Sequence, residues 1–353
     1  MQSFILNGKN ISAKDIRAGI ITGKTAFEQS TLTFCRQWLN GQATFSFKTS
    51  GSTGEPKPMT FTREQMQLSA QQTIRYFNLS PADTVLVCLN TAFIAGSIML
   101  VRTFDSGAKI IAIEPRSNPL LEVDTTIDFM AVVPLQLEQI LSVPETKLKL
   151  EKCRAVIVGG APISLALEEK IKQSSAKIYA TFGMTETLSH FALRQINPIY
   201  EEPFTVLENV VIGQDERGCL TVSSPVTQHQ MLITNDLVVM PSQNSFIWLG
   251  RVDHIINSGG IKIQIETLEK KIAKAFYELG LEYRFFITAT PDDTLGEKVV
   301  LIIECETPIR ALDELNWSLF LDPYEKPKEF LYAKRFIETP TGKINRLAIS
   351  KNI

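Results

Sequence analysis

Residues 48–58 read Lys48-Thr49-Ser50-Gly51-Ser52-Thr53-Gly54-Glu55-Pro56-Lys57-Pro58. Short runs in which apolar and hydroxyl residues alternate stand on both sides, at 44–47 and 59–61, so the stretch is predicted to be a loop between two strands. Its glycines free backbone N–H groups, its hydroxyls donate hydrogen bonds and its lysine adds a positive charge, which together suit a phosphate. An ordinary Ser/Gly hairpin turn would have the same composition.

The phosphate loop of kinases and GTPases differs from this stretch, because its lysine opens a helix whose N-terminus holds the phosphates. Here Pro56 stands where that loop needs an N–H group, and Pro58 biases Lys57 toward an extended backbone. The sequence therefore argues against that loop. Companion motifs elsewhere in the chain are needed to choose between a phosphate site and a plain turn.

The composition is that of an ordinary globular enzyme. The chain has 353 residues, 44% apolar and 21% charged, and its formal charge of -2 gives no reason to expect a nucleic-acid partner. Its five cysteines are far apart, with no C-x-x-C pair and no zinc-binding cluster. No segment approaches the ~20 apolar residues of a membrane span, and the N-terminus lacks the layout of a signal peptide. We therefore expect a cytoplasmic protein, either a monomer or a homodimer.

The order of apolar runs predicts an α/β fold. Strand-like runs at 84–89, 109–113, 129–133, 155–158 and 177–181 alternate with helical stretches, which is typical of parallel strands covered on both faces. From about residue 206 to 249 the pattern changes to short strands and turns, as in a β-rich subdomain. A new α+β unit begins near Arg251, with helices expected at 266–277 and 312–320. We predict an N-terminal domain at 1–250, a hinge at 251–253 and a C-terminal domain at 254–353.

Two motifs follow predicted strands. Val158-Gly159-Gly160-Ala161-Pro162 is a strand that ends in paired glycines, and in open parallel sheets ligands bind beyond such ends. Thr181-Phe182-Gly183-Met184-Thr185-Glu186-Thr187 offers an aromatic face for a purine, a hydroxyl for phosphate and a carboxylate for magnesium. A plain strand-to-helix turn and a helix cap, respectively, would explain the same residues.

Two more motifs lie toward the C-terminus. Asp236 follows a strand and can accept both hydroxyls of a ribose, and Arg251 can donate to the same sugar. His254 stands among apolar residues and is interpreted as structural. In Thr339-Pro340-Thr341-Gly342-Lys343-Ile344-Asn345-Arg346, a lysine on a glycine-containing turn could reach a reacting phosphate.

Taken together and in this order, the five motifs resemble those of the acyl-adenylate-forming superfamily, which includes acyl-CoA synthetases, adenylation domains of peptide synthetases and luciferases. The resemblance covers about residues 45–346. It implies a large N-terminal adenylate-forming domain with mostly parallel sheets between helices, a β-rich subdomain and a small mobile C-terminal domain. It also implies ATP, Mg²⁺ and coenzyme A as cofactors or substrates.

The resemblance also implies a role for each motif. ATP or AMP would be bound by Thr49, Ser50, Gly51, Ser52, Thr53, Gly54, Lys57, Gly159, Gly160, Ala161, Pro162, Phe182, Gly183, Asp236 and Arg251. Thr185 would touch the α-phosphate, Glu186 would bind magnesium and Lys343 would be the adenylation lysine. Asp253 would be the hinge, and Ser258, Gly259 and Gly260 would approach the CoA arm.

The sequence departs from the family pattern in several places. Asn235 stands where the family usually has glycine, and Gln264 where it usually has proline. Only 48 residues precede Thr49, whereas typical members have a much longer N-terminal subdomain. These differences put the shape of the N-terminal domain in question and leave an inactive nucleotide-binding relative as an alternative.

The acyl substrate is suggested by residues 93–104, an apolar helical run that contains Gly96 and Arg102. A buried arginine is costly unless it pairs with an anion, which is either a structural Asp or Glu or a ligand. The run resembles the corresponding segment of o-succinylbenzoate:CoA ligases of menaquinone biosynthesis, whose substrate carries a second carboxylate. Arg102 is therefore predicted to hold that carboxylate. Another aryl or fatty acid, ligated to CoA or to a carrier protein, is the alternative.

Overall fold

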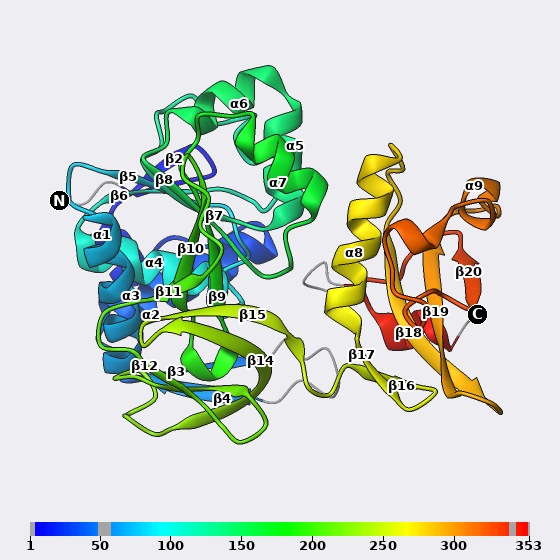
Figure 1. Cartoon of the computed structure of the whole chain (residues 1–353). Helices are drawn as coiled ribbons and strands as arrows, with labels where there is room; N and C mark the ends of the chain where they lie inside the picture. The colour runs from blue at the N-terminus through cyan, green and yellow to red at the C-terminus, as the bar shows by residue number, and fades with distance from the viewer. Residues whose placement is uncertain (1–3, 49–57, 339–343, 352–353) are drawn as a thin grey trace.

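The computed structural model describes residues 4–48, 58–338 and 344–351 of the chain. Figure 1 shows two groups of secondary structure that follow one another along the chain, the larger up to Arg251 and the smaller from Ile255 onward. The strands change from one sheet to the other at the predicted hinge, residues 251–253. The division into a fixed and a mobile domain stays a prediction.

Thirteen strands of the described residues form the main sheet, in the order β12-β13-β14-β15-β11-β10-β9-β8-β7-β5-β6-β1-β2. Their bounds are β1 Phe4–Leu6, β2 Lys9–Ile11, β5 Thr84–Val87, β6 Lys109–Ala112, β7 Phe129–Val132, β8 Ala155–Val158, β9 Ile178–Gly183, β10 His190–Asn197, β11 Phe204–Val206, β12 Val211–Gln214, β13 Cys219–Ser223, β14 Leu232–Ser242 and β15 Ser245–Arg251. The strands from β9 to β1 in this order are parallel, and the other neighbours are antiparallel.

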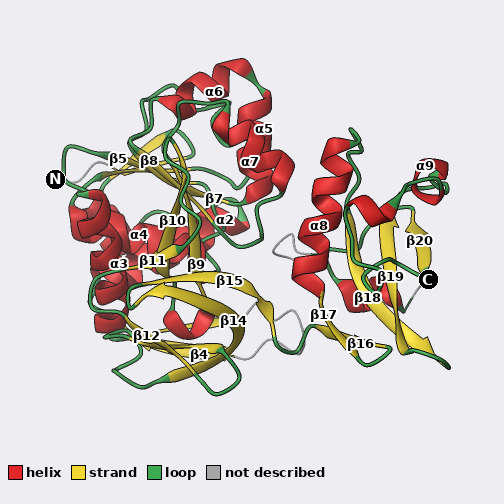
Figure 2. Ribbon diagram, in the orientation of Figure 1, coloured by secondary structure: helices red, strands yellow, loops and turns green. Residues whose placement is uncertain are grey.

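Helices cover both faces of the parallel strands (Figure 2). One layer contains α1 Ala13–Ala18, α2 Ala26–Leu39, α3 Arg63–Phe77 and α4 Ile94–Ser106, and the other contains α5 Pro134–Ser142, α6 Pro144–Glu151 and α7 Leu165–Lys172. Side chains of a strand alternate between the layers. Val85 and Val87 therefore belong to the core under α2, α3 and α4, whereas Leu86 and Cys88 belong to the core under α5, α6 and α7.

The predicted fold class is confirmed, with one difference in the β-rich part. Strands β10 to β15 do not form a sheet of their own but continue the main sheet from β9, through antiparallel pairing of β9 with β10. The expectation of a separate subdomain followed from the change in local periodicity. Pairing between distant strands is not visible in that periodicity, because it depends on tertiary contacts.

The strands predicted on both sides of residues 49–57 are present and pair as antiparallel neighbours, β3 Thr44–Lys48 and β4 Pro58–Thr62. A capping box starts α3. Gln65 N–H donates to Thr62 Oγ1 at 3.1 Å, and Thr62 N–H donates to Gln65 Oε1 at 2.9 Å. The sequence therefore fixes where β4 ends and α3 begins.

The second sheet contains β16 Ile255–Ser258, β17 Ile261–Gln264, β18 Phe285–Asp292, β19 Gly296–Glu304 and β20 Glu329–Ala333. Helix α8 Ile265–Glu278 packs Leu268 and Ile272 into one core with Trp317, and Phe336 and Ile349 belong to a second core with strand residues. Short helices α9 Arg310–Asp313 and α10 Arg346–Ser350 complete this part. Within the described ranges, no helix combines the length and apolar character needed to cross a membrane.

The helix predicted at 312–320 is wrong. The structure has instead the short α9 and the 3-10 turn η2 Trp317–Leu319. Trp317 is buried, and its indole N–H donates to the carbonyl of Leu312 at 3.1 Å, which folds the segment back on itself. The apolar spacing reflects the burial of these residues rather than a continuous helix.

Candidate active site

The turn after β8 needs glycine at two successive positions. A Cβ atom on Gly159 would lie 2.2 Å from Thr181 Oγ1 of the neighbouring strand β9, and Gly160 has φ +87°, a left-handed value that favours glycine. Gly160 and Pro162 are exposed, while Gly159 and Ala161 are half-buried. The four residues follow β8 at the carboxyl end of the parallel strands, where nucleotides bind in open sheets.

The second motif lies beside the first, because β8 and β9 are parallel neighbours. Phe182 is half-buried, and its ring meets those of Phe191, Phe204 and Phe246 edge-on at centroid distances of 5.8, 5.3 and 5.0 Å. This aromatic cluster fixes the position of the Phe182 ring. Stacking of that ring on adenine stays a prediction.

The 3-10 turn η1 Thr185–Thr187 follows β9. The Thr187 hydroxyl accepts from Met184 N–H at 3.1 Å and lies 2.7 Å from the carbonyl oxygen of Ser189, which fixes the turn. Glu186 is exposed and Thr185 is half-buried. In the described part of the chain no group of three His, Cys, Asp or Glu side chains is arranged to hold a metal. A magnesium ion that is bound together with substrate phosphates needs only one or two protein carboxylates, so Glu186 fits the predicted role.

Gly183 is required by the packing of this turn. A Cβ there would lie 2.3 Å from the carbonyl oxygen of Ser189 and 2.5 Å from Cα of His190, both backbone atoms. We expect Gly183→Ala to lower the free energy of unfolding by about 1–3 kcal/mol, measured by chemical denaturation. Gly213→Ala on β12 is the matched control, because the nearest atom there is the side-chain hydroxyl of Thr221 at 3.0 Å. Equal losses in the two variants would contradict this explanation.

Asp236 and Arg251 are cross-strand partners on β14 and β15. The indole N–H of Trp248 donates to Asp236 Oδ1 at 2.9 Å, and burial raises the pKa of this carboxyl. The guanidinium of Arg251 donates from Nε and Nη2 to the two oxygens of Asp253, at 3.0 and 2.9 Å. That pairing raises the pKa of Arg251 and lowers the pKa of Asp253. The predicted ribose ligands and the predicted hinge residue thus lie together, and their binding roles stay predictions.

Several hydrogen bonds connect the residues around the predicted hinge. Gln264 Nε2 donates to the carbonyl oxygen of Arg251 at 2.9 Å and to Glu266 Oε2 at 2.6 Å. Glu266 also pairs with His254 Nδ1 at 2.6 Å, which agrees with a structural role for this histidine. A Cβ on Gly250 would lie 2.5 Å from Gln264 Nε2. Gln264, a departure from the family pattern, therefore links the strand before the hinge to the segment after it.

The predicted CoA-facing residues form the turn of the β16–β17 hairpin. Ser258 pairs with Ile261, and the two residues between them, Gly259 and Gly260, have φ values of +59° and +80°. A two-residue hairpin turn with both φ values positive is the type that glycine favours. Ser258 is buried and the two glycines are exposed. The backbone of the two glycines is therefore accessible at the surface, and contact with CoA stays a prediction.

Arg102 is buried in α4, with only 2% of its surface exposed. Nη2 donates to Ser189 Oγ at 2.8 Å and lies 3.4 Å from His190 Nδ1, and Nη1 donates to the Met99 sulfur at 3.4 Å. Among the described residues no carboxylate lies within 4.0 Å of the guanidinium, and its Nε has no hydrogen-bond partner. Burial lowers the pKa of Arg102 to about 9.

The alternative of a structural ion pair is therefore wrong for the described chain. Asp105 lies one turn further along α4. Burial raises the pKa of its carboxyl, and the groups that partly offset this rise are Gln67 and Arg63, not Arg102. Gly96 on the same helix is buried, and a Cβ there would lie 2.4 Å from the carbonyl oxygen of Asn90. Close packing explains this glycine, and its contact with the acyl group stays a prediction.

Two predicted elements lie outside the described residues. They are the phosphate-loop residues Thr49, Ser50, Gly51, Ser52, Thr53, Gly54 and Lys57, and the lysine Lys343. The neighbours of both are described: Lys48 pairs with Pro58 in the hairpin, and Glu338 forms a β-bridge with Ile344. Arg346, at the end of the same motif, donates to both oxygens of Glu269 on α8 at 2.8 and 3.0 Å, which fixes the chain just after Lys343.

Sequence reasoning did not identify the polar residues around Arg102. They are Ser189 and His190, at the junction of η1 and β10, and Thr73 on α3, whose hydroxyl lies 3.1 Å from His190 Nε2. These side chains come from two segments, both distant in sequence from Arg102, so local spacing carries no signal of the group. The available sign was a histidine three residues after Thr187, at His190.

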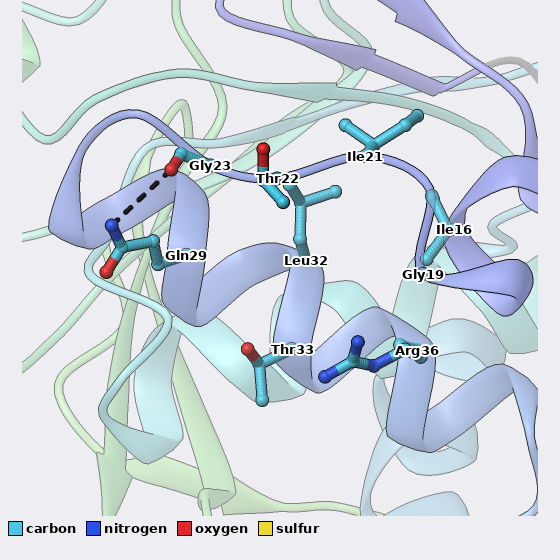
Figure 3. A pocket seen from close by; sticks show the side chains of 9 residues that line it. All are labelled: Ile16, Gly19, Ile21, Thr22, Gly23, Gln29, Leu32, Thr33 and Arg36. Atoms are coloured by element: carbon cyan, nitrogen blue, oxygen red, sulfur yellow. Dashed lines mark hydrogen bonds between the residues drawn. The ribbon is translucent and has the colours of Figure 1, made fainter.

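A separate pocket of about 300 Å³ lies between α1 and α2 (Figure 3). Gln29 and Arg36 of α2 line it, and Gln29 Nε2 donates to the carbonyl of Gly23 at 3.4 Å. None of the predicted site residues lines this pocket. This pocket is therefore not part of the candidate active site, whose place at the carboxyl ends of β8 and β9 stays a prediction.

Comparison with known proteins identifies the family. The family described as AMP-binding enzyme matches residues 40–225, more than half of the chain. Among solved structures, an acyl-CoA synthetase (AMP-forming)/AMP-acid ligase II-like protein from Dyadobacter fermentans is 38% identical. The match covers 97% of this chain and 98% of that one, with a TM-score of 0.65. The chain belongs to the AMP-binding enzyme family and has the fold of its adenylate-forming members.

More distant relatives include several 2-succinylbenzoate--CoA ligases beside other acyl-CoA synthetases, such as the human acyl-coenzyme A synthetase ACSM5, which is 22% identical over 90% of this chain and 62% of its own length. A 2-succinylbenzoate--CoA ligase of Listeria monocytogenes is 26% identical over 88% of this chain and 70% of its own length, and one of Escherichia coli is 25% identical over 86% and 67%. The O-succinylbenzoate coenzyme A synthetase of Bacillus subtilis, solved with ATP and magnesium, has a TM-score of 0.73 at 19% identity over 86% of this chain and 69% of that one. The last similarity concerns the fold alone.

Proposed function

We propose that this protein is an ATP-dependent acid:CoA ligase that joins a carboxylic acid to CoA through an acyl-adenylate, and that its acid is 2-succinylbenzoate. The observation that carries the choice of acid is the buried guanidinium of Arg102, which has no carboxylate partner among the described residues. The names of the relatives support the same acid.

The physical argument begins with the cost of burying a charge. An unpaired buried cation is destabilising, and its lowered pKa reflects that cost. Arg102 Nε lacks a partner in the described structure and Nη1 has only a thioether, so both N–H groups can donate to a ligand. A carboxylate that accepted from either N–H would form a charge-assisted hydrogen bond, which is stronger than a bond between neutral groups. An acid that is activated at one carboxylate and bound at a second one supplies it.

In the proposed first half-reaction, a carboxylate oxygen of the acid attacks the α-phosphorus of ATP and pyrophosphate leaves. Lys343 and the 49–57 loop would stabilise the negative charge that develops, and Thr185 would bind the α-phosphate. Magnesium, held by Glu186, supplies positive charge to the phosphates when bound. Asp236 would orient the nucleotide through its ribose. In this proposal no enzyme nucleophile is needed.

In the proposed second half-reaction, the CoA thiol attacks the acyl carbon and AMP leaves. The part of the chain after Asp253 would first turn, which withdraws Lys343 and brings the Ser258–Gly260 turn to the adenylate. Asp253 is paired with Arg251 and faces Asn235 Nδ2 at 3.4 Å. Rotation about residues 251–253 would have to break these contacts, so they oppose the movement.

The test is ATP–pyrophosphate exchange with a panel of acids. It should include 2-succinylbenzoate, aryl acids without a second carboxylate, and fatty acids. We expect 2-succinylbenzoate to give the highest kcat/KM, and CoA to convert the adenylate to thioester. Faster exchange with a monocarboxylic acid would favour the alternative aryl or fatty acid ligase. No acid-dependent exchange with any acid would favour an inactive nucleotide-binding relative.

A further inference from the structure

We infer that His190 is a positioning residue: together with Thr73 it fixes the orientation of the Arg102 guanidinium and thereby determines selection of acids that carry a second carboxylate. The inference deepens the proposed function and rests on it. It concerns two residues that have no role in the reaction described above.

The geometry is a continuous polar chain across three elements. Thr73 Oγ1 on α3 lies 3.1 Å from His190 Nε2, and His190 Nδ1 at the start of β10 lies 3.4 Å from Arg102 Nη2 on α4. Ser189 Oγ accepts from the same Nη2 at 2.8 Å. All three residues of the Thr73–His190–Arg102 chain are buried. These hydrogen bonds therefore hold one end of the guanidinium against α3 and β10.

Hydrogen-bond chemistry decides which atoms donate and which accept between Thr73, His190 and Arg102. Arginine has donors and no acceptor, so His190 Nδ1 must be the acceptor and must carry no proton. A neutral ring then has its proton on Nε2, which donates to Thr73 Oγ1. Burial, followed by the charge of Arg102, lowers the pKa of His190 well below its ordinary value, so the neutral ring is favoured. Arg102 thus selects the tautomer of His190, and Thr73 holds the other side of the ring by accepting from Nε2.

This arrangement leaves the other donors of Arg102 for a ligand. Nη2 is engaged by Ser189 and His190, whereas Nε has no partner in the described part of the chain. Ser69 is one turn before Thr73 on α3, so both side chains are on the same face. Its hydroxyl is also buried, with no partner among the described residues. Buried polar groups without partners are uncommon in folded proteins and mark places where a polar ligand or water binds.

The direct test compares His190→Leu with His190→Gln in pyrophosphate exchange. Leucine removes both hydrogen bonds, whereas glutamine can accept from Arg102 through Oε1 and donate to Thr73 through Nε2. We expect His190→Leu to raise the ratio of KM for 2-succinylbenzoate to KM for ATP by about tenfold or more. In His190→Gln the same ratio should stay within about threefold of the wild-type value. An unchanged ratio of the two KM values in His190→Leu would overturn the inference.

A second measurement is read from the wild-type protein, and a variant serves only to assign the signals. The chain has three histidines, and ¹⁵N spectra of the labelled imidazoles can be assigned by the loss of one set of signals in His190→Gln. Near neutral pH we expect His190 to be neutral with its proton on Nε2. A proton on Nδ1, or a charged ring, would overturn the inference. If the wild type uses no acid with a second carboxylate, the proposed substrate fails while this spectrum still tests the position of His190.

Discussion

Lys343→Ala is expected to abolish acyl-adenylate formation and to spare the conversion of supplied acyl-adenylate to thioester. The proposed role of Lys343 is to stabilise the charge on the reacting phosphates, and this charge is greatest in the transition state of the first half-reaction. Removing one such group typically costs about 100-fold or more in rate. The two half-reactions can be measured separately, by pyrophosphate exchange and by thioester formation from synthetic adenylate.

Lys351→Ala is a suitable control for this experiment, because Lys351 is an exposed lysine eight positions further along the chain, at the end of α10. It should leave both half-reactions at the wild-type rate. Loss of both half-reactions to the same extent in Lys343→Ala would contradict the proposal that the C-terminal part of the chain serves them in two orientations.

Arg102→Met should raise KM for 2-succinylbenzoate by about 100-fold while KM for ATP changes little. Loss of a buried charge-assisted hydrogen-bond pair costs about 2–5 kcal/mol, and about 1.4 kcal/mol corresponds to a factor of ten. Methionine keeps an unbranched apolar side chain in the helix, so the change removes charge with little loss of packing. Steady-state kinetics with both substrates measures the effect.

The comparison with Arg75→Met controls for general effects of removing an arginine. Arg75 lies on α3, and its ion pair with Glu208 is exposed, so it should contribute little to binding or stability. An acid without the second carboxylate should lose no affinity in Arg102→Met. Unchanged affinity for 2-succinylbenzoate in Arg102→Met would remove the basis for naming this acid.

Much of the fold follows from local sequence. The strands at Thr84–Val87, Phe129–Val132 and Ala155–Val158 are apolar on both faces because helices cover both, and Thr62 with Gln65 marks the start of α3. Helix α6 Pro144–Glu151 was not predicted, because its apolar positions form no clear stripe. Fusion of the β-rich part with the parallel strands depends on the β9–β10 pairing, which no local pattern encodes.

In the candidate site, too, local sequence explains some features and not others. Gly159, Gly183 and Gly250 stand at close backbone or side-chain contacts, which explains glycine at each position. In contrast, the partner of Arg102 could not be inferred from a single helix, because Thr73 and His190 come from other elements. The pairing of Arg251 with Asp253 was also not foreseen, since the motif suggested only a ribose ligand. Residue spacing within a motif thus does not predict which side chains from distant elements meet.

The central claim is that a carboxylate oxygen of the acid attacks the α-phosphorus of ATP. It is tested most directly with 2-succinylbenzoate labelled with ¹⁸O in the carboxyl group that becomes the thioester, in a complete reaction with ATP, Mg²⁺ and CoA. One ¹⁸O should appear in the phosphate of AMP, and none in pyrophosphate. Unlabelled AMP, or label in pyrophosphate or inorganic phosphate, would contradict the account.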